Sequence, residues 1–363
     1  MSKRDPAQDI AKGLGILFVL QLHGIQLNMV CFYVFNALVA FSMTVFFFLA
    51  GYNYRDKGLS PVKSMGKRVG KLLKTYVLWT LGTFLVMGTY FLIRGDGSPD
   101  EILKSFGASV LSESGCKMIG WKLPVSLFQH VLAPYWFIQY LITASVIFYL
   151  SSKYVLVSFK RLIFAVIILL GITFAFISFK VYLPWGIHCA PSIAAIMLTG
   201  AYLGKDDKLF SITSKPFMIV LYALASIVVV DTIGYFYPAA GILGAGLLGE
   251  FIGPVEVFIC YLISILGSYF LVSFGRLLNL IPVLNKCLIW LGRHTLIILL
   301  IHRPIAYVIR DVMGLPHFIS GRPLYVDSIT SVNLIAFLLI FVIMVPVIMM
   351  IDRLKAWKIK ERS

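Results

Sequence analysis

Long apolar segments recur along the whole chain of 363 residues, and they constrain its fold more than any other feature. A helix needs about 20 mostly apolar residues to cross the hydrocarbon core of a bilayer. The ten segments that suit a crossing are 10–27, 32–52, 75–93, 134–151, 162–179, 191–204, 216–233, 254–272, 288–309 and 328–351. The sequence therefore predicts an all-α integral membrane protein with about ten transmembrane helices.

The composition excludes a soluble enzyme and a disordered chain. Hydrophobic residues make up 60% of the sequence and charged residues 13%, against roughly 45–50% and about 25% in soluble globular proteins. A water-exposed surface cannot be built from so few charges. We find no internal repeat and no appended soluble domain, so residues 1–363 are interpreted as a single membrane domain.

The net charge of +16 is explained by the membrane rather than by nucleic acid. With the N-terminus inside, 24 of the 32 Lys and Arg residues fall on the cytoplasmic side. Positive charge collects in the short cytoplasmic loops of membrane proteins. We therefore expect a multi-pass protein of the inner (plasma) membrane with both termini cytoplasmic. No small-residue cleavage site follows the first segment, so we interpret it as a helix rather than a secretory signal.

The first segment, DIAKGLGILFVLQLHG, carries three ionisable residues that a plain transmembrane helix does not need. Asp9 and Lys12 stand near its start, and His23 follows Lys12 by eleven residues. Eleven steps of about 100° leave Lys12 and His23 about 20° apart on one face and about 16 Å apart along the axis. Ionisable groups inside a bilayer are costly and are therefore functional candidates. A neutral His23 bonded to a neighbouring helix is the alternative for this residue taken alone.

A basic segment follows the second apolar segment and ends at Tyr76. Its charged residues, several of them at helical spacing, are Lys63, Lys67, Arg68, Lys71 and Lys74. An ordinary cytoplasmic loop on anionic lipid explains most of this charge. A phosphate-binding rim at the mouth of a cytoplasmic cavity is the sharper interpretation. Spacing alone does not decide between the two.

A third polar group lies in the ninth segment, within GRHTLIILLIHRPI. Arg293 and His294 fit the inner membrane boundary, whereas His302 and Arg303 fall near mid-depth. His302 can bond to a neighbouring helix, but the cation of Arg303 needs a partner or water at that depth. The acidic candidates for that partner, which otherwise line an outward-facing cavity, are Asp231, Glu250 and Glu256.

Five blocks, in their order and spacing, resemble the membrane acyltransferase-3 family. The blocks are DIAKGLGILFVLQLHG, FFFLAGYNYR, KRVGKLLKTYVLWT, PYWFIQYLI and LGRHTLIILLIHRP. Each is a loose pattern, but the ordered set is specific and spans residues 4–310. Members of this family are integral membrane O-acyltransferases, and most of them acetylate cell-surface glycans. The resemblance implies the stand-alone form, without an appended soluble domain.

The resemblance carries over to particular residues. The family's basic residue followed eleven positions later by histidine matches Lys12 and His23, although the family more often has arginine at the first position. Its basic pair after the second helix matches Arg68 and Lys71, again with lysine in an arginine place. Further matches are Trp136, at the start of the fourth segment, and His302. The chain departs from the family at Ala50-Gly51, where a Ser-Gly pair would supply a hydroxyl.

The resemblance implies an acyl-CoA donor, most often acetyl-CoA, that enters from the cytoplasm. The expected donor-binding residues are Lys12, Lys67, Arg68, Lys71, Lys74 and Tyr76. The expected catalytic set is His23 as the general base, Asp9 as the residue that orients the basic side chains, and His302. The candidates on the acceptor side are Trp136, Arg303 and Glu256. The acceptor is then a hydroxyl of a glycan or glycolipid, and we expect no metal and no nucleic acid.

Two other function classes compete with an acyltransferase. A transporter or flippase would use the intramembrane His, Arg and acidic residues as a relay, but the chain lacks the internal repeats common in such proteins. A non-catalytic scaffold would not need His23, His302 and Arg303 in its core. Two structural questions also stay open: whether Cys116 and Cys189 form a disulfide in outer loops, and whether the glycine-rich stretch 234–253 is re-entrant.

Overall fold

The computed structural model describes residues 5–24, 42–118, 127–205, 217, 220, 256–315 and 331–360, and these residues form helices joined by short turns. The elements up to residue 135 are α1 (Pro6–Gly24), α3 (Thr44–Tyr52), α4 (Pro61–Arg94), α5 (Pro99–Met118), α6 (Leu127–Leu132) and the 3₁₀ turn η1 (Ala133–Tyr135). The remaining elements are α7 (Trp136–Val155), α8 (Phe159–Ser178), the 3₁₀ turn η2 (Pro184–Gly186), α9 (Ala190–Leu203), α13 (Glu256–Leu278), α14 (Pro282–Val312) and α15 (Ser331–Lys360). The described part contains no strand, as an all-α prediction requires.

Six helical stretches in the described residues are long and apolar enough to cross a bilayer. They are Pro61–Arg94, Phe159–Ser178, Pro184–Leu203, Val257–Leu278, Pro282–Val312 and Leu334–Leu354. They correspond to the third, fifth, sixth, eighth, ninth and tenth predicted spans. Parts of the first two predicted spans, nearly all of 216–233 and the whole of 234–253 lie outside the described residues. The protein is therefore a multi-pass membrane protein, while the count of ten stays a prediction.

The α9 helix is enclosed by other helices over most of its length. Eleven of its residues are buried, and it packs against α3, α7 and α8. At the contact with α3, a Cβ on Gly51 would lie 1.8 Å from the backbone oxygen of Met197, and a Cβ on Gly200 would lie 2.3 Å from that of Phe48. Small residues let helix backbones approach closely in membranes, where lipid offers no hydrophobic drive for association.

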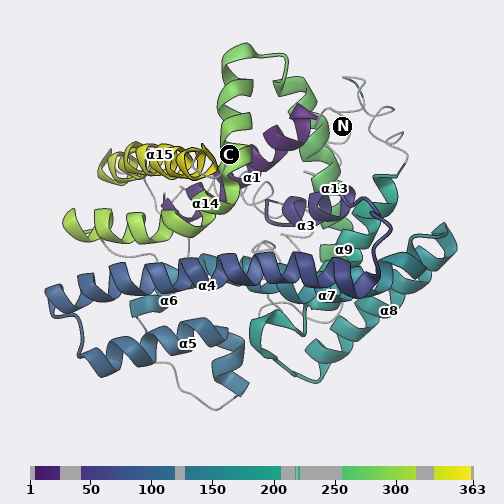
Figure 1. Ribbon diagram of the computed structural model, residues 1–363, viewed down its shortest axis with the longest axis horizontal. Coiled ribbons are helices and arrows are strands. Elements are labelled where there is room, and N and C mark those ends of the chain that lie inside the picture. The colour runs from purple at the N-terminus through teal and green to yellow at the C-terminus, as the bar shows by residue number, and fades with distance from the viewer. Residues whose placement is uncertain are drawn as a thin grey trace.

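Two helices that no apolar segment predicts, α5 and α6, lie between the third and fourth predicted spans. The α5 helix begins with a capping box: the Glu101 N–H donates to Ser98 Oγ at 3.3 Å, and the Ser98 N–H donates to Glu101 Oε2 at 2.8 Å. The Glu101 carboxylate also accepts a hydrogen bond from the Ser98 hydroxyl at 2.9 Å, and the bonds from the Ser98 N–H and hydroxyl lower the pKa of the Glu101 carboxyl. The helix then packs against the long α4 (Figure 1), with the rings of Phe84 and Phe106 4.3 Å apart.

The predicted topology can be tested with two reporter tags. We expect a tag after Ser363 to be cytoplasmic, because the positive charge and an even number of spans place both termini inside. A tag inserted near Ser98 should be accessible from outside, because three spans precede it. Accessibility to a membrane-impermeant label measures both. If the two tags report the same side, the number of spans before residue 98 is not three.

Candidate functional site

The α1 helix carries both residues of the predicted basic–histidine pair. It is continuous from Pro6 to Gly24, so Lys12 and His23 lie on one unbroken helix, about 16 Å apart along its axis. The side chain of His23 lies outside the described part of the molecule. Its predicted role as a base therefore rests on the sequence and on this helical backbone.

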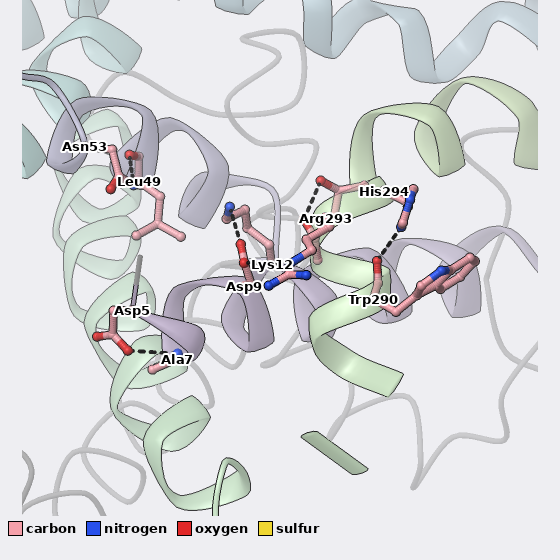
Figure 2. A network of polar contacts seen from close by, with 11 residues as sticks. Asp5, Ala7, Asp9, Lys12, Leu49, Asn53, Trp290, Arg293 and His294 are labelled. Carbon is pink, nitrogen blue, oxygen red and sulfur yellow. Dashed lines mark hydrogen bonds and ion pairs between the residues drawn. The ribbon is translucent and has the colours of Figure 1, made fainter. Parts of the chain in front are cut away.

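Asp9 is the buried centre of an ion-pair network at the start of α1 (Figure 2). Its residue exposure is 1%, and Lys12 Nζ lies 3.0 Å from its Oδ1 atom. The second oxygen, Oδ2, lies 3.5 Å from Nε of Arg293 on α14. The Asp9 carboxylate thus pairs with the Lys12 ammonium, and its role in orienting the basic side chains for catalysis stays a prediction. Arg293, which the sequence placed only at the membrane boundary, also belongs to this network.

The network forms because α1 and α14 cross with their backbones in close contact. A Cβ on Gly292 would lie 1.8 Å from the backbone oxygen of Asp9, and a Cβ on Gly13 would lie 2.2 Å from that of Leu288. Each helix thus supplies a glycine where the other helix exposes a carbonyl oxygen. The crossing fixes the distance between Asp9 and the residue after Gly292, which is Arg293.

The basic segment is the first part of α4 rather than a loop, because Ser60 caps the helix and Pro61 begins it. Lys67, Lys71 and Lys74 lie exposed on this helix. Arg68 is half-buried and close enough to Tyr149 of α7 to interact with it electrostatically. Of these four predicted donor-binding residues, Arg68 therefore faces the protein, and the three lysines face outward.

Tyr76, predicted to bind the donor together with the basic residues, is instead enclosed by protein. Its exposure is 3%, and its hydroxyl accepts a hydrogen bond from Nε2 of Gln139 at 2.8 Å. The same Gln139 nitrogen donates to the backbone oxygen of Val110 on α5 at 3.0 Å, and the indole of Trp185 donates to that oxygen at 3.2 Å. Tyr76 thus joins α4 to α5, α7 and η2, and a role in donor binding stays a prediction.

His302 and Arg303 lie side by side in the buried half of α14. Their exposures are 1% and 7%, and His302 Nδ1 lies 3.0 Å from the backbone oxygen of Ile298. Among the described residues, Nε of Arg303 has no hydrogen-bond partner. Its proposed acidic partners are not visible, because 231 and 250 and the side chain of Glu256 lie outside the described part.

The remaining predicted residues have simpler surroundings. Trp136 begins α7, as the PYW block predicted, and its ring meets that of Tyr140 edge-on, with the ring centroids 5.2 Å apart.

Cys189 is buried next to α9, and the side chain of Cys116 lies outside the described residues, so their pairing is untested. The described residues contain no group of three or more His, Cys, Asp or Glu that could hold a metal ion.

Comparison with known proteins identifies one family. The model of the acyltransferase-3 family, described as an acyltransferase domain, matches residues 5–353. No curated protein and no solved structure matches the chain. The match covers nearly the whole sequence, including α1, the basic segment of α4 and the buried half of α14.

Proposed function

The chain belongs to the acyltransferase-3 family, and from this premise we propose that it moves a short acyl group, in most cases acetyl, from acyl-CoA to a glycan hydroxyl. Membership in this family makes it a membrane acyltransferase. The proposal adds the donor, the acceptor, the inner membrane as its location and His23 as the general base. A transporter or a scaffold is not retained, because the matched family transfers acyl groups.

The observation that carries the proposal is the arrangement along α1. A cationic network at Asp9 stands at one end of the helix, and His23 lies about 16 Å beyond Lys12 along the axis. Acyl-CoA is long and thin, with phosphates at one end and a thioester at the other. Phosphates bound at the cationic end would leave the pantetheine arm to reach toward His23.

The chemistry that we propose at His23 is a direct acyl transfer. The neutral imidazole takes the proton of the acceptor hydroxyl, and the hydroxyl oxygen attacks the thioester carbonyl carbon. The bond from carbon to sulfur breaks, the new ester forms, and the imidazolium returns its proton to the CoA thiolate. The products are the acylated acceptor and free CoA, so no other co-reactant is needed.

A thiol-release assay tests the proposal. Purified full-length protein should release free CoA from acetyl-CoA, and a short-chain glycan acceptor should increase the rate. A series of acyl-CoA donors from acetyl to succinyl would identify the preferred group. A folded preparation that releases no thiol from any of these donors, with or without acceptor, would contradict the proposed activity.

Donor binding gives a second test, on Arg68 and Lys71. Replacing both with alanine should weaken CoA binding and leave the thermal unfolding midpoint unchanged, because partly exposed basic residues rarely carry stability. We expect Arg68→Ala to have the larger single effect, since Arg68 faces α7. Lys63→Ala, an exposed lysine of the same segment, is the matched control. Equal losses for CoA and for acyl-pantetheine, which lacks the nucleotide phosphates, would show that Arg68 and Lys71 do not bind phosphate.

A further inference from the structure

In the described part of the molecule, the network at Asp9 joins one carboxylate to two cationic side chains. Asp9 is buried, and Lys12 alone provides one full neutralising charge at 3.0 Å from Oδ1. Arg293 adds a second cation at 3.5 Å from Oδ2. The three side chains together carry a net charge of +1 at the point where α1 and α14 cross.

Arg293 contacts Asp9 with only part of its guanidinium group. The distance from Nε to Oδ2, 3.5 Å, is longer than the 2.7–2.9 Å that is typical of charge-assisted hydrogen bonds. The Arg293 side chain is 64% exposed, whereas that of Asp9 is 2% exposed. An arginine has five N–H donors in a planar fork, four of them on the two terminal nitrogens. The contact with Asp9 therefore engages Nε, while the Arg293 side chain as a whole stays 64% exposed.

The backbone beneath Arg293 is held from two directions. On one side, Gly292 touches the backbone oxygen of Asp9, where a Cβ would lie only 1.8 Å away. On the other side, His294 lies 2.7 Å from the backbone oxygen of Trp290 and 2.6 Å from Oδ2 of Asp352 on α15. Figure 2 shows Arg293 between these contacts, beside Lys12 and Asp9. Because the backbone at Arg293 is held in place, this exposed arginine is better suited to bind a ligand than a freely moving surface charge is.

We propose that Arg293, with Lys12, binds a phosphate group of the acyl donor at the crossing of α1 and α14. The proposal rests on the proposed function and deepens it, because it adds a residue from α14 to a donor site expected on α1 and α4. Arginine suits this role because its planar fork binds two phosphate oxygens at once, whereas lysine acts as a point charge. The phosphate of an anionic lipid has the same chemistry, so the test must separate the two sources.

The test measures donor binding by the full-length protein in nanodiscs of phosphatidylcholine, a lipid without net charge. The probes are coenzyme A, adenosine 3′,5′-bisphosphate as its nucleotide end, and acetyl-pantetheine as its thioester end. We expect Arg293→Ala to weaken binding of the two nucleotide probes on the order of 10-fold to 100-fold, as for loss of a hydrogen-bonded charge pair. The KM for acetyl-pantetheine should not change.

Two further variants make the result specific. Lys286→Ala removes an equal charge from an exposed position at the start of α14 and should leave both affinities unchanged. Arg293→Lys keeps the charge but loses the fork, so its affinity should fall between those of wild type and Arg293→Ala. This variant also provides the comparison if the alanine variant does not fold.

The possible results separate the inference from the proposed function. If the wild type turns over acetyl-CoA while both Arg293 variants bind coenzyme A as tightly as it does, the inference is overturned and the function stands. If the wild type neither binds coenzyme A nor releases it from acetyl-CoA, both fail. If the Arg293 variants lose affinity only when anionic lipid replaces phosphatidylcholine, the residue binds lipid headgroups, and the inference is again overturned.

Discussion

Replacing His23 with alanine is expected to lower turnover of acetyl-CoA on the order of 10²–10⁴-fold, the usual contribution of a positioned proton acceptor. Donor affinity should be nearly unchanged, because the phosphates are expected to bind about 16 Å away, at the Lys12 end of α1. The measurement compares turnover, CoA affinity and the thermal unfolding midpoint on one preparation of the variant.

A structural histidine would behave differently, and the chain offers one for comparison. His188 is fully buried, and its Nδ1 atom lies 3.1 Å from the backbone nitrogen of Leu183 and 3.2 Å from that residue's oxygen. His188→Ala should lower the unfolding midpoint, with binding and turnover declining together. The His23→Ala variant could instead be stable, bind CoA and transfer acyl groups at close to the wild-type rate. That result would contradict the proposal that His23 is the general base.

The same base predicts a direction for the pH dependence. Only the neutral imidazole of His23 can accept the proton of the acceptor hydroxyl. Turnover should therefore fall as the pH is lowered and the imidazole takes up a proton. The rate with saturating donor, measured from pH 5 to 8, checks this, and His23→Ala should lose this part of the profile.

The sequence predicted the helices that carry a strong local signal. An apolar run predicts a span wherever a helix faces lipid, and the predicted 162–179 differs from the observed Phe159–Ser178 by three residues at one end and one at the other. The α5 helix was not predicted in this way, because it is polar and packs against protein rather than lipid. Its capping box at Ser98 and Glu101 was a local signal that could have revealed it.

The candidate site was predictable only where its parts are close in sequence. Asp9 and Lys12 stand three residues apart, so their ion pair on one helix face could be expected. Arg293 joins them through the crossing of two helices far apart in sequence, which no local pattern indicates. Tyr76 was grouped with the basic residues that precede it, although it follows the buried Leu72 by four positions and so shares its inward face.

Replacing Asp9 with alanine is expected to be the most destabilising change in the donor region. Removing one partner of a buried ion pair costs roughly 3–5 kcal/mol, because the other charge stays buried. Arg293 can turn to solvent, since its side chain is 64% exposed, but Lys12 is only 15% exposed. The loss should therefore come mainly from Lys12 and lie toward the lower end of that range, visible as a lower thermal unfolding midpoint.

A double-mutant cycle distinguishes this cause from a simple loss of packing. Asp9→Asn keeps the volume and removes the charge, so it should also destabilise the protein. Combining it with Lys12→Met removes the stranded ammonium, and the double variant should be more stable than Asp9→Asn alone. The double variant should nevertheless bind coenzyme A weakly, because the network has lost one of its cations. If the effects of the two substitutions on stability simply add, the buried ion pair between Asp9 and Lys12 does not hold this end of α1 in place.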